Sequence, residues 1–266
     1  SLQSKSELLK ETKKEIDVLL DNDNWLVLIP KTKSASIIYG KGTRWCTASE
    51  SYNYFENYSK DGPLYIIIDK QVKPSEKNYS KIYKHQFHFE TDQFMNADDV
   101  RIDHIAFLGK YPELLNVFAS MKNGFGLTLK LLFGLPIPES EKEITLPAGK
   151  TLNLSSIKCD TLPENLVIHG SLNLEKSDHI KSLKNITVNG DLFLGQSSIE
   201  RIEGKLYVQG KLDIENCQKF TTLPEDFFVG SSLRAKYCDI KELPKGVVKG
   251  MIYVSSNVLF KTISKD

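Results

Sequence analysis

The sequence predicts two different structures in one chain: an α+β domain in the N-terminal half, followed by a repetitive solenoid with a parallel β-sheet. Three observations predict this. The chain has 266 residues, which is long for one ordinary domain. The N-terminal half mixes segments of helical and of strand periodicity. In the C-terminal half, glycines recur every twenty residues, at Gly170, Gly190, Gly210, Gly230 and Gly250.

Short helices and strands are expected to alternate over residues 1–121, which we predict to form the α+β domain. Helical spacing of apolar residues, together with glycines where helices would end, predicts helices at residues 4–20, 32–42, 49–62 and, as one or two closing helices, 98–121. Apolar or alternating runs predict strands at residues 24–30, 63–69 and 81–91, the last two joined antiparallel through the polar loop 70–80. Residues 122–143 are interpreted as a connector.

Residues 144–266 are expected to form five or six repeat units of about twenty residues. An alternating apolar pair returns after each glycine and predicts one short inward-facing strand per unit, so that the inward leucines of the stacked strands share one row. The pairs are Leu172 and Leu174, Leu192 and Leu194, Leu212 and Ile214, and Ile252 and Val254. The residues expected to turn the chain after these strands are Ser177, Ser197, Cys217, Cys238 and Asn257.

Composition and charge exclude several functional classes. The net charge is +1, from 35 Lys and Arg against 34 Asp and Glu, so nucleic acid is not implied as a partner. No apolar run reaches the roughly 18 residues of a membrane span, and the charged first twenty residues do not resemble a signal peptide. The four cysteines are dispersed, which argues against a zinc site and a disulfide framework and favours a reducing cytosol. No cofactor is indicated.

The repeat resembles the bacterial LPX-type leucine-rich repeat over residues 144–263. Period, strand pair, turning residue and the Leu-Pro dipeptides at Leu162, Leu223 and Leu243 agree with that pattern. The resemblance implies an extended recognition face instead of a deep pocket. Exposed aromatic and arginine side chains dominate protein hot spots, so a protein partner is expected; a merely solvated face is the alternative. The outward strand residues expected to bind this partner are Phe193, Asp213, Arg234 and Tyr253.

Cys46, in a Trp-Cys-Thr corner of the N-terminal half, is the one cysteine with a claim to reactivity. A nucleophilic thiol needs a nearby base, a cation or a helix N-terminus. Arg44 lies two residues away, and His88 on the third predicted strand is a candidate base, oriented by Asp92 or Asn96. The sequence has no nucleophile elbow, glycine-rich phosphate loop or HExxH motif. The alternative is a structural corner whose tryptophan and cysteine fill the core.

A second resemblance covers residues 24–105. The run from "SIIYGKGTRWCTA" through "GPLYIIID" to "QFHF" and "QFM" before acidic residues is similar to an uncharacterised domain of tailed-phage and phage-derived bacterial proteins. The resemblance implies a phage origin and a shared site, but no known reaction. The positions that match its motif are Arg44, Trp45, Cys46, Thr47, Gln86, Gln93, Asp98 and Asp99.

The acidic segment around residues 90–103 permits two interpretations. Its carboxylates could bind a metal or a sugar, although no EF-hand spacing supports this. We expect instead that Asp98 and Asp99 lie at the N-terminus of the following helix, where carboxylates favour the helix dipole.

These observations favour an interaction protein whose repeats bind a host or phage protein in the cytoplasm of an infected bacterium. The first alternative is an enzyme that uses Cys46 on a target recruited by the repeats. The second is a virion-associated structural protein. The target, any small ligand and the oligomeric state are not indicated by the sequence.

Overall fold

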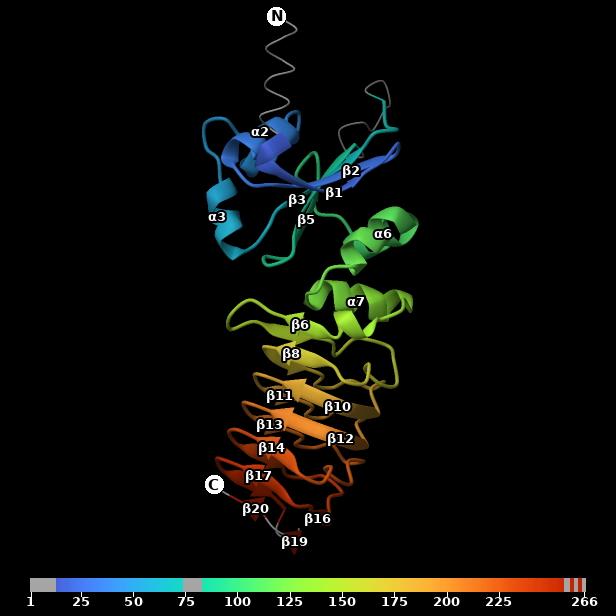
Figure 1. Ribbon diagram of the computed structural model, residues 1–266, viewed down its shortest axis with the longest axis vertical. Coiled ribbons are helices and arrows are strands. Elements are labelled where there is room, and N and C mark those ends of the chain that lie inside the picture. The colour runs from blue at the N-terminus through green and yellow to red at the C-terminus, as the bar shows by residue number, and fades with distance from the viewer. Residues whose placement is uncertain (1–12, 74–82, 256–258, 261–262, 265–266) are drawn as a thin grey trace, which may run out of the picture. The chain divides into compact units, whose positions relative to one another are not determined.

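The computed structural model describes residues 13–73, 83–255, 259–260 and 263–264. The chain forms two compact units, Ser1–Val117 and Phe118–Asp266 (Figure 1). In the described part of the chain, no helix combines the length and the apolar character that crossing a membrane requires.

A five-stranded antiparallel sheet, in the order β1-β2-β3-β4-β5, forms the centre of the N-terminal unit (Figure 1). Its strands are β1 Ile16–Asp21, β2 Trp25–Pro30, β3 Tyr65–Asp69, β4 Lys84–His88 and β5 Gln93–Asn96. The helical segments are η1 Lys13–Glu15, α2 Lys33–Gly40, η2 Cys46–Ala48, α3 Phe55–Asp61, α5 His104–Lys110 and α6 Pro112–Ala119, which crosses into the second unit. The predicted α+β class is therefore confirmed.

The predicted helix over residues 4–20 is wrong where the structure describes it. Residues 16–21 form β1, which pairs antiparallel with β2 from Ile16 opposite Pro30, and residues 1–12 lie outside the described residues. Val18 and Leu19 are exposed, and only Ile16 is buried in the core. The apolar residues thus form no helical face, and backbone pairing with the neighbouring strand outweighs the local helical spacing. Part of the predicted loop, residues 74–80, also lies outside the described residues.

The two faces of this sheet bury different side chains, because successive residues of a strand point to opposite sides. One face packs against α2 and η2 through a cluster that includes Leu28, Ala35, Trp45 and Ile66. The other face is aromatic, with Phe87 5.1 Å from Phe94 and 6.0 Å from Phe107 of α5 between ring centroids.

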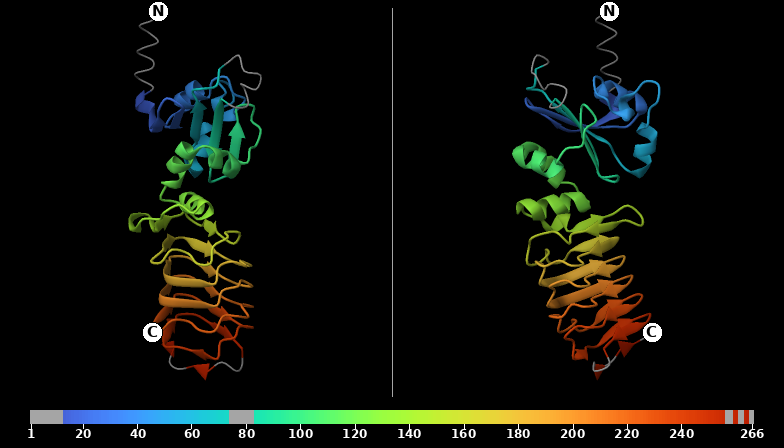
Figure 2. Two further views of the ribbon diagram at one scale, coloured as in Figure 1. Left: turned by 90° about the vertical axis from the view of Figure 1, so that its right-hand side faces the viewer. Right: turned by 180° about the vertical axis from the view of Figure 1, so that it is seen from behind.

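The C-terminal unit is a β-solenoid of stacked parallel strands, which confirms the predicted solenoid class (Figures 1 and 2). A seven-stranded sheet contains β6 Glu143–Thr145, β8 Val167–His169, β10 Ser182–Val188, β12 Arg201–Val208, β14 Phe227–Val229, β17 Gly246–Val248 and β20 Ile263–Ser264. A six-stranded sheet contains β7 Thr151–Asn153, β9 Ser171–Asn173, β11 Leu192–Phe193, β13 Leu212–Asp213, β15 Leu233–Ala235 and β18 Ile252–Val254. A smaller sheet pairs β16 Glu242–Leu243 with β19 Leu259–Phe260.

The expectation of one strand per unit is wrong, because the chain forms a strand on each side of the recurring glycine. In the strand before the glycine, alternate side chains also point inward. These buried side chains form a second inward row, which consists of Ile168, Val188, Val208, Val229 and Val248. The strand after the glycine forms the row that the sequence predicts. Its pairing residues are Leu152, Leu172, Leu192, Leu212, Leu233 and Ile252.

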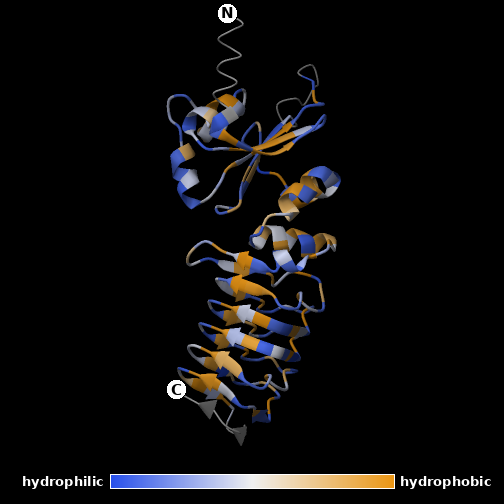
Figure 3. Ribbon diagram, in the orientation of Figure 1, coloured by the Kyte–Doolittle hydropathy of each residue, from blue (hydrophilic) through white to orange (hydrophobic). Residues whose placement is uncertain are grey.

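The two inward rows form one continuous hydrophobic core between the sheets. Leu172, Leu192, Leu212 and Leu233 have no solvent exposure, and Figure 3 shows apolar residues repeated along successive strands. Each coil therefore stabilises its neighbours by burying apolar area that it could not bury alone.

The period of the glycines has a steric cause. A Cβ atom on Gly190 would lie 2.6 Å from the carbonyl carbon and oxygen of Gly170, and one on Gly230 would lie 2.2 Å from the carbonyl oxygen of Gln209. Successive coils thus approach backbone to backbone at this corner, which only glycine permits.

Part of the segment interpreted as a connector is the helix α7, Gly124–Phe133. Asn123 caps its N-terminus by accepting from the Gly126 N–H, and Leu127 is buried in the solenoid core with Ile144 of the first coil. Lys130, nearly buried, pairs with Glu141 of η3 (Glu139–Glu141) at 2.5 Å. The first coil therefore packs against a helix of its own unit.

Candidate functional site

The outward face of the six-stranded sheet brings together all four residues predicted to bind a partner. Phe193 lies opposite Asp213, Asp213 opposite Arg234, and Arg234 opposite Tyr253 in the parallel ladder. Asn153 and Asn173 continue the same outward row on β7 and β9. The twenty-residue period thus converts residues far apart in the chain into neighbours along one row.

Three members of this row accept hydrogen bonds from nearby backbone N–H groups. The side-chain oxygens of Asn153, Asn173 and Asp213 each accept the backbone N–H two residues later, at 3.0, 2.8 and 3.0 Å. Such a bond stabilises the turn that ends the strand. Phe193, Arg234 and Tyr253 occupy the equivalent place without a side chain suited to this bond, so their side chains do not stabilise the turn; Arg234 pairs with acidic groups instead, and the Tyr253 hydroxyl donates to the Met251 sulfur at 2.9 Å.

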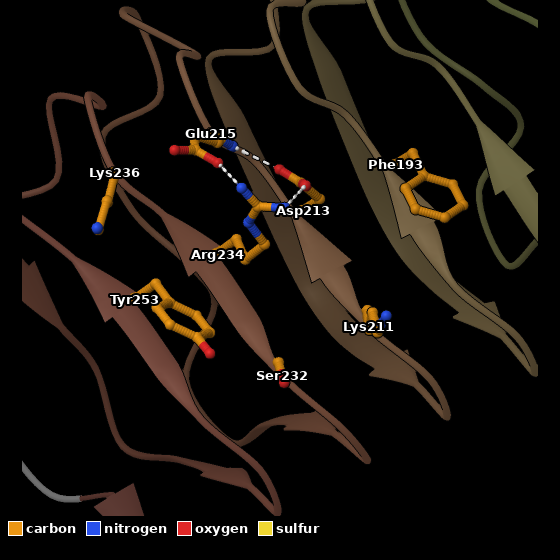
Figure 4. Close-up of a pocket in the computed structure, with 8 residues that line it drawn as sticks. All are labelled: Phe193, Lys211, Asp213, Glu215, Ser232, Arg234, Lys236 and Tyr253. Atoms are coloured by element: carbon orange, nitrogen blue, oxygen red, sulfur yellow. Dashed lines mark hydrogen bonds and ion pairs between the residues drawn. The ribbon is translucent and has the colours of Figure 1, made fainter.

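A shallow pocket of about 520 Å³ lies over these strands. Figure 4 shows Arg234 and Asp213 between the rings of Phe193 and Tyr253. The residues that line it are Phe193, Lys211, Asp213, Glu215, Ser232, Arg234, Lys236 and Tyr253.

The charges in the pocket are only partly balanced. The Arg234 guanidinium forms ion pairs with Asp213, at 3.7 Å, and with Glu215. Among the described residues, Lys211 and Lys236 form no ion pair, so two lysine charges remain available beside an arginine held in place by its partners. Aromatic rings beside a positioned arginine suit the recognition of a protein surface.

Glu215 and Lys236 are functional candidates that the sequence reasoning missed. Both line the pocket and both lie two residues beyond a predicted site residue, Asp213 and Arg234. Since side chains two apart in an extended segment point the same way, the period that identified the central row could have identified this neighbouring row.

The Trp-Cys-Thr corner of the N-terminal unit is held to the sheet by long-range hydrogen bonds. The Trp45 indole N–H donates to the Asn96 carbonyl oxygen at 2.6 Å, and the Gln86 amide donates to the Thr47 hydroxyl at 2.7 Å. The Arg44 backbone N–H donates to the Ala97 carbonyl oxygen at 2.8 Å. Trp45, Thr47 and Gln86 are all buried. These motif residues therefore connect the corner to β4 and β5.

His88 is already occupied by other contacts. Its Nδ1 lies 2.7 Å from the Thr91 hydroxyl, and its Nε2 faces the carbonyl oxygens of Tyr58 and Gly62 at 3.1 and 3.3 Å. Carbonyl oxygens only accept, so Nε2 carries a proton and donates to them. Both ring nitrogens are used within the fold.

The residues proposed to orient His88 lie elsewhere. Asp92 is exposed and forms an ion pair with Arg101. Asn96 directs its side-chain oxygen to the backbone N–H groups of Asp98 and Val100, both at 3.0 Å. Asp92 is therefore paired with Arg101 instead of orienting His88, while Tyr58 contacts both other members of the predicted set: it shares a hydrogen bond with Cys46, and its ring lies edge to face with His88 at a centroid distance of 5.2 Å.

The environment of Cys46 opposes activation of its thiol. Burial, followed by the negative charge of Asp99, raises the pKa of the Cys46 thiol, although a hydrogen bond with Tyr58 lowers it in part. The Tyr58 hydroxyl also donates to the Gln93 side chain at 2.9 Å. Gln93, another motif residue, thus belongs to the same network as Cys46.

The expectation for Asp98 and Asp99 is wrong. The following helix, α5, begins at His104 and is capped by Asp103, whose carboxylate accepts the Ala106 N–H at 2.9 Å. Asp99 adopts a left-handed conformation in the preceding turn, with φ of 61°. The turn separates both residues from the helix end, and among the described residues no group of three or more His, Cys, Asp or Glu side chains is placed to hold a metal ion.

Alkylation of Cys46 is expected to be slow at neutral pH and to accelerate only above the pH range of an ordinary cysteine, whose pKa is about 8.5. The reason is that the raised pKa keeps the thiol protonated. Iodoacetamide labelling of the native protein at several pH values, quantified for the Cys46 peptide by mass spectrometry, measures this. Cys238, whose pKa burial raises to about 12, provides an internal reference for an unreactive thiol. An apparent pKa clearly below 8.5 would contradict the expectation.

Comparisons with protein-family models, with curated proteins and with solved structures found no match to this chain.

Proposed function

We propose that the chain is an interaction protein whose solenoid binds another protein through the outward face of the six-stranded sheet. The observation that carries this proposal is the row that contains Phe193, Arg234 and Tyr253. At these three places, a ring or a guanidinium replaces the turn-stabilising side chain found in other coils. The solenoid does not need these side chains for its turns, so recognition accounts for them best.

The proposed partner is a host or phage protein in an infected bacterium. The sequence resemblance of residues 24–105 to a tailed-phage domain supports this setting, and the sequence resemblance of residues 144–263 to LPX-type leucine-rich repeats supports a protein as the partner. Contact with a protein would bury the two rings and would use the unpaired ammonium groups of Lys211 and Lys236 at the rim.

Changing Phe193, Arg234 and Tyr253 together to asparagine is expected to weaken capture of the partner by at least about tenfold, because it removes two aromatic side chains and an arginine of the hot-spot type. The thermal midpoint should change little, since asparagine restores the side chain found in the first coils. Affinity capture from infected cells with the full chain, quantified by mass spectrometry, measures the loss.

A matched triple variant on the other sheet controls for the number of substitutions: Lys184→Asn, Glu203→Asn and Lys249→Asn. All three residues are exposed on the seven-stranded side of the coils. Capture should survive this control. Equal capture by the two triple variants would refute the proposed face.

A further inference from the structure

A second pocket lies wholly within the N-terminal unit, on the aromatic side of its sheet. It measures about 330 Å³, which is within the range of small-molecule sites. Trp25 at the start of β2 and Tyr111 at the end of α5 form its apolar part together with Pro112. The two rings lie edge to face, with centroids 4.8 Å apart and planes at 65°. The Phe107 ring packs against both, with its centroid 6.4 Å from that of Trp25 and 5.2 Å from that of Tyr111.

The charged groups that line this pocket are both acidic. Asp69 ends β3 and Glu113 lies in the first turn of α6. Asp69 Oδ1 accepts the Gln71 N–H at 2.8 Å, and Glu113 Oε2 accepts from the Asn24 amide at 3.4 Å. These bonds position the carboxylates but do not neutralise them. Among the described residues neither forms an ion pair, and the nearby Lys70 is directed to Asp21 instead.

This combination selects one class of ligand. A bare metal ion would gain nothing from the rings of Trp25 and Tyr111 and prefers more oxygen ligands. A neutral apolar molecule would cover Asp69 and Glu113 without pairing them, which costs free energy, and an anion would be repelled. A cation that carries methyl or methylene groups can contact the rings and the carboxylates together.

We propose that this pocket binds a small organic ammonium ion, held by Trp25 and Tyr111 through its alkyl groups and by Asp69 and Glu113 through its charge. The site is independent of the solenoid face and of Cys46. It would add recognition of a small molecule to the N-terminal unit.

Choline is the probe for this proposal, and 3,3-dimethylbutan-1-ol, its neutral counterpart of the same shape, is the matched control ligand. The sequence contains two tryptophans, and the indole N–H resonances of Trp25 and Trp45 can be followed separately in ¹⁵N-labelled full-length protein. Trp45 lies in the core on the other side of the sheet, with its N–H bonded to Asn96, so it serves as an internal reference. Choline should shift the Trp25 resonance saturably and leave Trp45 in place. The neutral alcohol should bind at least about tenfold more weakly.

The double variant Asp69→Asn and Glu113→Gln tests the carboxylates directly. Both changes keep an acceptor oxygen for the Gln71 N–H and the Asn24 amide, so the fold should persist, as circular dichroism would verify. The dissociation constant for choline should rise at least about tenfold. Asp23→Asn removes a neighbouring exposed charge that does not line the pocket. This control should change the dissociation constant for choline less than about twofold. The proposal fails if Trp25 does not respond saturably, if the alcohol binds as well as choline, or if the double variant binds choline unchanged.

Discussion

Replacing Leu212 with alanine is expected to lower the free energy of unfolding of the C-terminal unit by about 4 kcal/mol. Leu212 has no solvent exposure and lies in the inward row between Leu192 and Leu233. Its removal leaves a cavity in the middle of the stack, and the strands on both sides are fixed by ladders to further coils. The site therefore has little freedom to collapse, which places the cost toward the upper part of the usual range.

The measurement must separate the two units. Both tryptophans, Trp25 and Trp45, lie in the N-terminal unit, so urea unfolding followed by tryptophan fluorescence should be unchanged by Leu212→Ala. The transition of the solenoid, followed by circular dichroism or by hydrogen exchange of β13, should move to lower urea. Leu132→Ala is the matched control in the same unit, because Leu132 is 44% exposed and should cost less than about 1 kcal/mol. Equal effects of the two changes would contradict the inward row.

The solenoid was predictable because its determinants repeat locally. Each coil contains its own inward residues and its own glycine, so one sequence suffices to reveal the row through Leu172 and Leu192. The second sheet was missed because short apolar segments such as the one ending at Val188 do not show by themselves on which side of the glycine a strand forms. The burial of Val188 beside Val208 results from stacking, which sequence spacing does not display.

The N-terminal unit was less predictable because long-range contacts determine it. The sequence identified Trp45, Thr47 and Gln86 as related positions, but not that Thr47 bonds to Gln86 across 39 residues. Likewise, β1 was mistaken for helix because its partner strand, and not its own apolar spacing, determines its conformation. Neither the Thr47–Gln86 bond nor the pairing of β1 with β2 can be recognised from a short stretch of sequence.

The two candidate sites differ in the same way: one is built from locally repeated positions and the other from long-range contacts. The pocket on the solenoid joins residues one period apart, so four of its lining residues could be selected in advance. The pocket at Trp25 joins the starts and ends of β2, β3 and α5, and no period relates these positions. Hence the repeat spacing was enough to place the first set of residues side by side, whereas no local pattern indicated the second set.

Gly230→Ala is expected to destabilise the solenoid by about 3 kcal/mol, at the upper end of the overpacking range. Two effects oppose each other. Alanine restricts the unfolded chain, which alone would stabilise the protein by about 0.4–1 kcal/mol. The new Cβ, however, would lie 2.2 Å from the Gln209 carbonyl oxygen and 3.0 Å from its carbon. Because these are backbone atoms of the adjacent coil, they cannot move aside as a flexible side chain would, and the steric cost prevails.

Gly195→Ala separates these two effects in the same solenoid. There the nearest atom to a new Cβ is the Glu215 carbonyl oxygen at 3.4 Å, an ordinary contact, so only the restriction of the unfolded chain remains. Urea unfolding of the C-terminal unit should therefore show Gly195→Ala neutral or slightly stabilising, within about 1 kcal/mol. If Gly230→Ala were equally harmless, the close approach of coils would not explain the twenty-residue period of glycines. If Gly230→Ala destabilises the solenoid and Gly195→Ala does not, the recurring glycines mark the positions where the backbone of one coil contacts the backbone of the next.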